Sequence, residues 1–452
     1  MRSPTRPDTV AKPLTLLILA IGFVAVLTAD LPGHLSYDSV LQLHDGRTGH
    51  YNSWHPPIMA WLLGLGDAVL PGAAVFMTLN AALLFASLAM MVLARRRVGW
   101  LAPLVAAAMA VSPLLLIYQG IVWKDVLFAN AAVAGFLALS QAVRTERFAW
   151  RAALVVWAFL LFGVATLIRQ NGLLVLAAGT FALVGMVVRL GGRARLKWAL
   201  LLGIGAFSIT TVLAVAADAA LMTRRIDALG PVAQLRALQG YDIIGSLSHD
   251  PKIDLAPLGS PALAQRWRDA AARIYTPERM DDLYDALEIG KPSKVPNAAV
   301  ARQWRAVIAQ HPAAFLQHRW EVFRWTLFTP VLTRCLPVWA GIDGAANMLE
   351  DLSLVGGQRP QDEALEAYAT GFYGTPVFSH VFYGLVAIAA LLLLARLRGP
   401  GDAPIVFMLL SALAFAASFA LISLACDYRY LYFLDLAAMV AVFHLALGRR
   451  SG

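Results

Sequence analysis

The chain has 452 residues, of which 59% are hydrophobic and only 14% are charged, and its formal net charge is +9. Soluble globular domains carry roughly 25% charged residues, so this composition excludes an ordinary soluble protein. Apolar runs of about 20 residues, the length needed to cross a bilayer, recur along the chain. The composition therefore predicts an all-α polytopic membrane protein, with about 10 transmembrane helices and a mainly helical domain outside the membrane.

The expected spans begin close to the N-terminus. The first, 12–29, follows basic residues, and we interpret it as an uncleaved anchor rather than a signal peptide, because the residues after Ala29 suit cleavage poorly and more spans follow. The number of spans around 152–189 stays open. The remaining spans are expected at 73–94, 100–118, 126–143, 152–168, 172–189, 197–217, 377–395, 403–425 and 430–447.

Basic residues predict the orientation of these spans. The two termini and the short loops on their side of the membrane hold 17 Lys and Arg against three Asp and Glu, which leaves −5 of the net +9 for the rest of the chain. Loops rich in Lys and Arg stay in the cytoplasm. We therefore expect a multi-pass protein of the bacterial inner membrane, with both termini cytoplasmic and the large loop periplasmic. The positive charge then reflects orientation, and no nucleic-acid partner is expected.

The spans and loops divide the chain into three parts. Residues 1–217 form an N-terminal membrane block of about seven spans, which includes a polar first periplasmic loop at 30–72. Residues 218–376 hold 16 Lys and Arg and 18 Asp and Glu, a charge density that belongs in water, and are expected to form a periplasmic loop domain. Residues 377–452 form a C-terminal block of three spans.

The loop domain has the sequence features of a helical domain. The tripeptide Thr-Pro-Glu at 276–278 places a capping residue before a proline, a pattern that opens many helices. Asn297 suits the cap of a second helix that ends near Gln310, and Pro312 suits the start of a third.

The chain has two cysteines, Cys335 and Cys426, and both fall on the periplasmic side of the expected topology. That compartment permits disulfides. The sequence leaves two possibilities open, a bridge between them or two isolated buried thiols.

Four groups of ionisable residues interrupt the apolar pattern, and all four fall on the periplasmic side. Ionisable groups in or beside a membrane are costly and usually functional, so a common site is the simplest interpretation. The groups are Tyr37-Asp38 with His55 in the first loop, Trp123-Lys124-Asp125, Arg169-Gln170-Asn171-Gly172, and Asp427-Tyr428-Arg429-Tyr430.

Structural explanations for single members of these groups stay open. Asp38 could be an acid in the first turn of a short helix capped by Ser36, where the helix dipole favours a carboxylate. Arg169 could cap the carbonyl groups of the preceding helix. Four of the nine histidines also lie in the first loop and could bind a metal with Asp38 and Asp45, but their spacing matches no compact zinc motif, and surface or packing roles are favoured. These are His34, His44, His50 and His55.

The residue types indicate the chemistry of the expected site. Cations at the membrane surface suit a phosphate or pyrophosphate group. A nearby carboxylate suits removal of a proton from a hydroxyl group. Together they favour transfer of a group from a lipid-linked phosphate donor to an acceptor alcohol.

The same residues resemble a known family. The first loop is similar to that of the polytopic C-type glycosyltransferases, which include the protein mannosyltransferases and aminoarabinose transferases. Ser39 stands where these proteins usually have Glu, and Ile58 where they have Leu. The groups around Asp125 and Arg169 resemble the second acidic site and the basic turn of the family, and Trp304 to Arg319 resembles a helix pair of bacterial members. The matching first-loop residues are Tyr37-Asp38-Ser39, Gln42, Gly46, Tyr51 and His55-Pro56-Pro57-Ile58.

The resemblance implies a role for each residue. Asp38 would be the catalytic base, and Asp125 would place the acceptor or, with Asp38, hold a divalent metal ion. Lys124, Arg169 and Arg429 would neutralise the phosphate of a polyprenyl-phosphate sugar donor, with inversion at the sugar carbon. Asp30 is a second candidate base outside the motif. Further site candidates are Tyr37, His55, Asn171, Tyr428 and Tyr430.

The sequence thus predicts a membrane glycosyltransferase of the cell envelope that uses a lipid-linked donor. Its acceptor, expected to be a glycan, lipid or protein, and its hexosyl or pentosyl sugar are not indicated. One alternative is a transporter or flippase for a lipid-linked sugar, which needs cations but no base in the first loop. Another is an oligosaccharide polymerase or ligase with a pyrophosphate-linked donor.

Overall fold

The computed structural model describes residues 8–51, 54–224, 232–288 and 295–448. Over these residues the chain is helical, with no strand and only isolated β-bridges. Nine helices are long and apolar enough to cross a membrane. They are α1 (Asp8–Asp30), α4 (Ala74–Leu93), α7 (Lys124–Arg144), α8 (Phe148–Ile168), α9 (Leu173–Gly191), α10 (Leu196–Met222), α17 (His380–Leu397), α18 (Asp402–Ile422) and α19 (Tyr432–Ala446).

A tenth span is broken. Helix α5 (Leu101–Val111) is followed by α6 (Pro113–Leu116) and a short 3₁₀ turn at Tyr118–Gly120, and the two halves meet at 68°. Pro113 lacks the backbone N–H that would continue the helix, which accounts for the break after Ser112. Within the described residues the number of candidate spans is therefore nine or ten, and the predicted all-α polytopic fold is confirmed.

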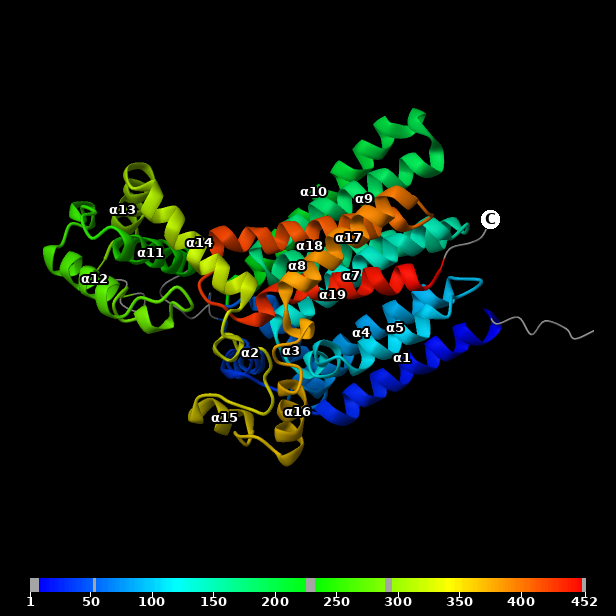
Figure 1. Ribbon diagram of the computed structural model, residues 1–452, viewed down its shortest axis with the longest axis horizontal. Helices are drawn as coiled ribbons and strands as arrows, with labels where there is room; N and C mark the ends of the chain where they lie inside the picture. Colours follow the sequence, from blue (N-terminus) through cyan, green and yellow to red (C-terminus); the bar gives the residue numbers. More distant parts are fainter. Residues whose placement is uncertain (1–7, 52–53, 225–231, 289–294, 449–452) are drawn as a thin grey trace, which may run out of the picture.

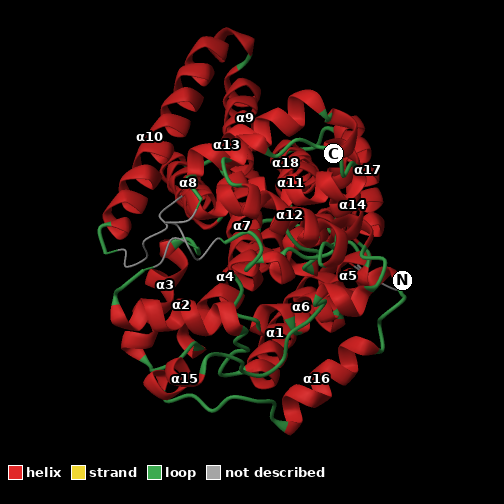
Figure 2. Cartoon of the chain, turned by 90° about the vertical axis from the view of Figure 1, so that its left-hand side faces the viewer, coloured by secondary structure: helices red, strands yellow, loops and turns green. Residues whose placement is uncertain are grey.

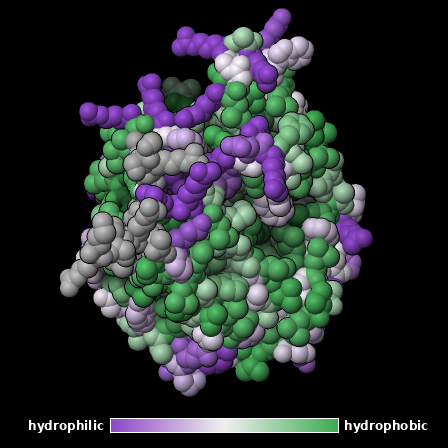
Figure 3. Space-filling model, turned by 90° about the vertical axis from the view of Figure 1, so that its right-hand side faces the viewer, coloured by the Kyte–Doolittle hydropathy of each residue, from purple (hydrophilic) through white to green (hydrophobic). Residues whose placement is uncertain are grey.

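The spanning helices lie roughly parallel in one bundle (Figure 1). The short connections α4–α5, α7–α8, α9–α10 and α17–α18 share one end, and basic side chains tie them together there. Lys12 Nζ donates to the carbonyl oxygens of Leu93 and Arg95, at 3.0 and 2.8 Å. Figure 3 views this end, where hydrophilic side chains project from a largely apolar surface.

Helix α7 lies at the centre of the bundle, and 89% of its apolar stretch is buried. Small residues on its surface let neighbouring helices approach. At Gly135 a Cβ atom would lie 2.4 Å from the Phe162 ring of α8, so any larger residue would push the two helices apart. A polar network joins α7 to α4 through Asn130, whose amide nitrogen donates to Asn80 Oδ1 at 3.0 Å and to Gln119 Oε1 at 2.7 Å. Gln119 Nε2 extends the network to α19 by donating to the Tyr432 hydroxyl at 3.0 Å. The burial of α7 matters because its first residues belong to the candidate site.

The remaining helices gather at the opposite end of the bundle (Figures 1 and 2). Helices α11 to α14 share a second hydrophobic core around Trp267, which is 1% exposed. The helices at this end are α2 (Tyr37–Thr48), α3 (Pro57–Val69), α11 (Val232–His249), α12 (Pro261–Arg273), α13 (Asn297–Gln310), α14 (Pro312–Phe328), α15 (Ala346–Leu352) and α16 (Pro360–Thr370).

The structure tests the helix starts predicted for the loop domain. Helix α13 covers Asn297–Gln310 and α14 begins at Pro312, as expected, but the N-cap of α13 is Pro296 and Asn297 is its first helical residue, so the predicted cap is wrong by one position. The helix start predicted at 276–278 is wrong, because this segment pairs with the connection between α18 and α19. Its backbone groups bond there instead of within a helix: Cys426 N–H donates to Glu278 O at 2.8 Å, and Met280 N–H donates to Leu424 O at 2.9 Å.

Helix α2 crosses α3 at two glycines that face each other. A Cβ on Gly46 would lie 2.2 Å from the Ala60 carbonyl oxygen, and one on Gly64 would lie 2.4 Å from the Gly46 carbonyl oxygen. Only hydrogen in place of a side chain permits this approach. The crossing holds α2, and the carboxylate near its start, against the bundle.

Candidate functional site

The start of α2 is tied to the start of α7. Ser36 occupies the N-cap position, as expected, although its side chain makes no capping hydrogen bond. Its hydroxyl instead accepts from Trp123 Nε1 at 3.0 Å. Ser39 Oγ donates to the Val122 carbonyl oxygen at 2.7 Å. These bonds bring Asp38, in the first turn of α2, next to the first residues of α7.

Arg429 connects the first, second and fourth sequence groups. One of its terminal nitrogens lies 2.8 Å from Asp38 Oδ2 and 3.1 Å from Asp427 Oδ2. Its Nε lies 3.7 Å from Asp125 Oδ2, and its guanidinium carbon is 4.9 Å from the centre of the Trp123 ring. The guanidinium is therefore surrounded by three carboxylates and an aromatic face, an arrangement that orders its plane.

Arg169 adds the third sequence group to this cluster. Its guanidinium pairs with Asp125, which is only 2% exposed. The same guanidinium lies 5.1 Å from the Tyr430 ring and 5.4 Å from the Phe419 ring. The side chain therefore makes an ion pair with α7. Asn171 fixes the turn between α8 and α9 to α18, because its amide nitrogen donates to Ser418 Oγ at 3.0 Å.

Lys124 and His55 complete the cluster beside Asp38. Lys124 Nζ lies 3.5 Å from His55 Nδ1, and His55 Nε2 lies 3.6 Å from Asp38 Oδ1. Burial alone would raise the pKa of Asp38, but His55 in its protonated form and the charges of Arg429 and Lys124 outweigh burial and hold that pKa well below its usual range. Burial, followed by the charge of Lys124, lowers the pKa of His55 to about 3. At neutral pH the site therefore holds an ionised Asp38 and a neutral His55.

The cluster is nearly balanced in charge. Its cations Lys124, Arg169 and Arg429 lie among the carboxylates Asp38, Asp125 and Asp427. Both arginines are in contact with a carboxylate, whereas the Lys124 ammonium lies next to a neutral imidazole. Lys124 is therefore the cation whose charge is least compensated at close range.

Three of the candidates make no side-chain hydrogen bond, ion pair or ring contact with this cluster in the described residues. Tyr428 is fully buried and stacks on His380, with ring centres 3.9 Å apart. Tyr37 is 53% exposed. Asp30 is buried against His34, with Oδ1 3.0 Å from Nε2. Of the candidate tyrosines, only Tyr430 contacts the clustered arginines.

The described residues contain no group of three or more His, Cys, Asp or Glu side chains that could hold a metal ion. His34 pairs with Asp30 and His44 with Asp351, whereas His55 lies beside Asp38. Asp38 and Asp125 do not fit a shared divalent ion, because Arg429 lies between them and contacts both.

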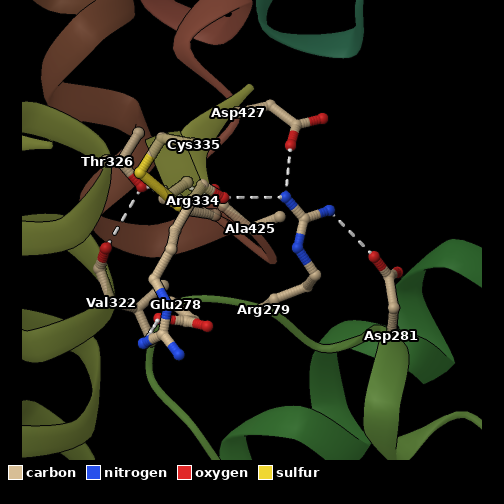
Figure 4. Close-up of a disulfide and its surroundings, with 11 residues drawn as sticks. Glu278, Arg279, Asp281, Val322, Thr326, Arg334, Cys335, Ala425 and Asp427 are labelled. Atoms are coloured by element: carbon tan, nitrogen blue, oxygen red, sulfur yellow. Dashed lines mark hydrogen bonds and ion pairs between the residues drawn. A yellow bond between two sulfur atoms is a disulfide. The ribbon is translucent and has the colours of Figure 1, made fainter. Parts of the chain in front are cut away.

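Two contacts at the rim of the site join it to the loop domain, and sequence reasoning missed one of them. Figure 4 shows Arg279 between two carboxylates, 3.0 Å from Asp427 Oδ1 and 3.0 Å from Asp281 Oδ2. Beside it, Cys335 and Cys426 form a disulfide. The bridge was one of the two possibilities that the sequence left open. Arg279 had no sequence signal, because it is an ordinary basic residue in a charged domain.

The neutral state of His55 predicts a loss of stability in acid. The folded-state pKa lies below the ordinary value of 6.5, so this contribution is fully present above pH 6.5 and is lost as the pH falls toward about 3. At pH 5 the loss is expected to be about 2 kcal/mol. We expect His55→Gln to remove this part of the decrease in thermal unfolding temperature between pH 7 and pH 5, measured in detergent. His44→Gln, a control at a partly exposed pair, should keep it, and equal pH slopes in both variants would contradict the prediction.

Comparisons with known proteins give weak similarity. No protein-family model and no curated protein matches the chain. The archaeal oligosaccharyltransferase AglB from Archaeoglobus fulgidus, solved with an inhibitory peptide and a dolichol-phosphate, is 12% identical, with a TM-score of 0.37. The similarity covers 96% of this chain but 50% of AglB, so the chain spans half the length of that protein. ArnT from Cupriavidus metallidurans in the apo state is 15% identical, with a TM-score of 0.36, and the similarity covers 95% and 77% of the two chains.

Proposed function

We propose that this protein is a membrane glycosyltransferase that moves a sugar from a polyprenyl-phosphate donor to an acceptor hydroxyl on the periplasmic face. The observation that carries the proposal is Asp38, a carboxylate that is 34% exposed and lies between Arg429 and the side chains of Lys124 and His55. An accessible base beside cations is the arrangement required to deprotonate an alcohol next to a phosphate.

The proposed step is a single displacement. The acceptor hydroxyl gives its proton to Asp38 as its oxygen forms a bond to the anomeric carbon. The bond from that carbon to the phosphate oxygen breaks, and its electron pair leaves with the phosphate, so the configuration at carbon inverts. Cations that stabilise the departing phosphate make a general acid unnecessary.

Arg429 links donor binding to the basicity of Asp38 in this proposal. In the described structure its contact with Asp38 helps to hold the pKa of the carboxyl low, which also makes it a weak base. A donor phosphate would compete with Asp38 for the same guanidinium. Loss of that contact would raise the basicity of Asp38 when the donor is in place, which favours transfer to a bound acceptor over reaction in an empty site.

The donor side of the proposal is tested at Lys124. We expect Lys124→Gln to weaken binding of a polyprenyl phosphate about tenfold or more, because a hydrogen bond to a charged group is lost. Binding is measured by native mass spectrometry of the full-length protein. Lys197→Gln, which changes an exposed lysine at the other end of the bundle, is the matched control. Unchanged affinity in Lys124→Gln, or an equal loss in the control, would contradict the phosphate-binding role.

We further propose that both termini are cytoplasmic and that the site faces the periplasm of a bacterial inner membrane. The support is the charge asymmetry of the sequence, with 17 Lys and Arg against three acids in the segments assigned to the cytoplasm. We also propose the division into 1–217, 218–376 and 377–452, with the middle part as the domain that contributes most to acceptor choice.

A further inference from the structure

A pocket of about 460 Å³ lies between two stretches of the loop domain, 333–343 and 357–373. This volume is in the range of small-molecule sites. Its lining is partly apolar, and its polar and aromatic side chains include Trp339, Asp343, Gln358, Glu366, Thr370 and Tyr373.

Two chains of contacts link the pocket lining to the candidate site. The carbonyl oxygen of Pro337, in the pocket lining, accepts from the Tyr118 hydroxyl at 2.5 Å, and the Tyr118 ring lies 5.8 Å from the Trp123 ring. The guanidinium of Arg429 lies over this same Trp123 ring. A second link runs through Leu35, which exchanges hydrogen bonds with Gly341 O and Asp343 N, both at 2.9 Å.

These links place the pocket beside the start of α2. Leu35 lies three residues before Asp38, and Cys335, at the edge of the pocket lining, is bridged to Cys426, three residues before Arg429. The pocket lining is therefore tied to the segments that carry the proposed base and its arginine. A group bound in the pocket would therefore lie near the segments of Asp38 and Arg429, and not at a remote part of the surface.

The pocket is acidic, whereas the candidate site combines cations with carboxylates. Asp343 and Glu366 are its ionisable acids, and among the described residues no lysine or arginine lines it. Glu366 Oε2 accepts from Gln358 Nε2 at 2.7 Å. Burial, with a smaller effect of Glu366, raises the pKa of Tyr373 to about 12, so its hydroxyl stays a hydrogen-bond donor. Trp339, another lining residue, has a buried indole Nε1 without a hydrogen-bond partner in the described residues.

We propose that this pocket binds the acceptor, and that the acceptor presents a sugar headgroup without negative charge. The inference rests on the proposed transferase function. Two carboxylates favour hydroxyl and ammonium groups and repel phosphate and carboxylate groups. Aromatic faces suit the apolar side of a sugar ring. The anionic donor and the acceptor are thereby directed to separate places.

The test measures binding of three monosaccharide probes to the full-length protein in nanodiscs by saturation-transfer NMR titration. We expect glucosamine to bind more tightly than methyl glucoside, and glucuronate to bind most weakly. Glu366→Gln and Asp343→Asn should each weaken glucosamine about tenfold, the loss expected for one hydrogen bond to a charged group, and leave methyl glucoside within about twofold. Glu363→Gln is the matched control, because Glu363 is exposed on the same helix, α16, outside the pocket lining.

Binding of glucuronate as tight as that of glucosamine would overturn the proposal, as would absence of binding for all three probes or an equal effect of Glu363→Gln. Binding of a polyprenyl phosphate is measured on the same samples. Normal lipid binding with no charge preference among the sugars rejects the pocket and keeps the transferase proposal. A charge preference without lipid binding rejects the donor assignment and keeps a sugar site.

Discussion

Replacement of Asp38 by asparagine is expected to lower sugar transfer by about two to four orders of magnitude, the usual contribution of a general base. Asparagine keeps the shape of the side chain but cannot take the hydroxyl proton. The expected readout is the set of envelope glycans and lipids, measured by mass spectrometry in cells that carry the variant as the only copy. Because the cations remain, donor binding should persist.

Two comparisons make the Asp38→Asn result specific. Asp351→Asn changes an exposed carboxylate that contacts the same helix, α2, through His44 at 3.1 Å, and it should transfer normally. A transporter of lipid-linked sugars would still move its lipid in the Asp38→Asn variant, since transport needs no base there. Full transfer by this variant would remove Asp38 from the mechanism.

Replacement of Asp125 by alanine is expected to lower the free energy of unfolding by about 3–5 kcal/mol, because it leaves two nearly buried arginines without a shared partner. Asp125 is 2% exposed, and Arg169 and Arg429 are each 11% exposed. The measurement is thermal or denaturant unfolding in detergent, followed by tryptophan fluorescence.

The matched control for this prediction is Asp281→Ala. Asp281 also pairs with an arginine, Arg279, but it is 67% exposed, so its removal should cost less than about 1 kcal/mol. Equal stability of the Asp125→Ala variant and the unmodified protein would show that the other neighbours of the two arginines hold them without Asp125: the aromatic rings and, for Arg429, Asp38 and Asp427. Asp125 would then be free for a direct role with the acceptor.

The spans were predictable because apolar runs of bilayer length are a local property of the sequence. Each of the ten expected spans corresponds to a helix or to the broken pair around Ser112. The break itself was missed, because a proline in an apolar run gives no bend angle. The helix start predicted at 276–278 was wrong for a related reason. The capping pattern is local, but the backbone of this segment pairs with 424–426, which is nearly 150 residues away in the sequence.

The sequence by itself determined which residues were candidates, since charges beside apolar spans are rare enough to be recognised singly. Only the tertiary structure decided which of them meet. The fold brings together Asp38, Lys124, Asp125, Arg169 and Arg429. Tyr430 contacts the arginines of this cluster, whereas Tyr428 stacks on His380 instead. Arg279 joins the rim of the site through Asp427. Neighbouring residues on one turn point to different sides, so chain position cannot separate Tyr428 from Tyr430. The charge balance of the site has the same origin, because a carboxylate compensates an arginine only when packing brings the two within a few ångströms.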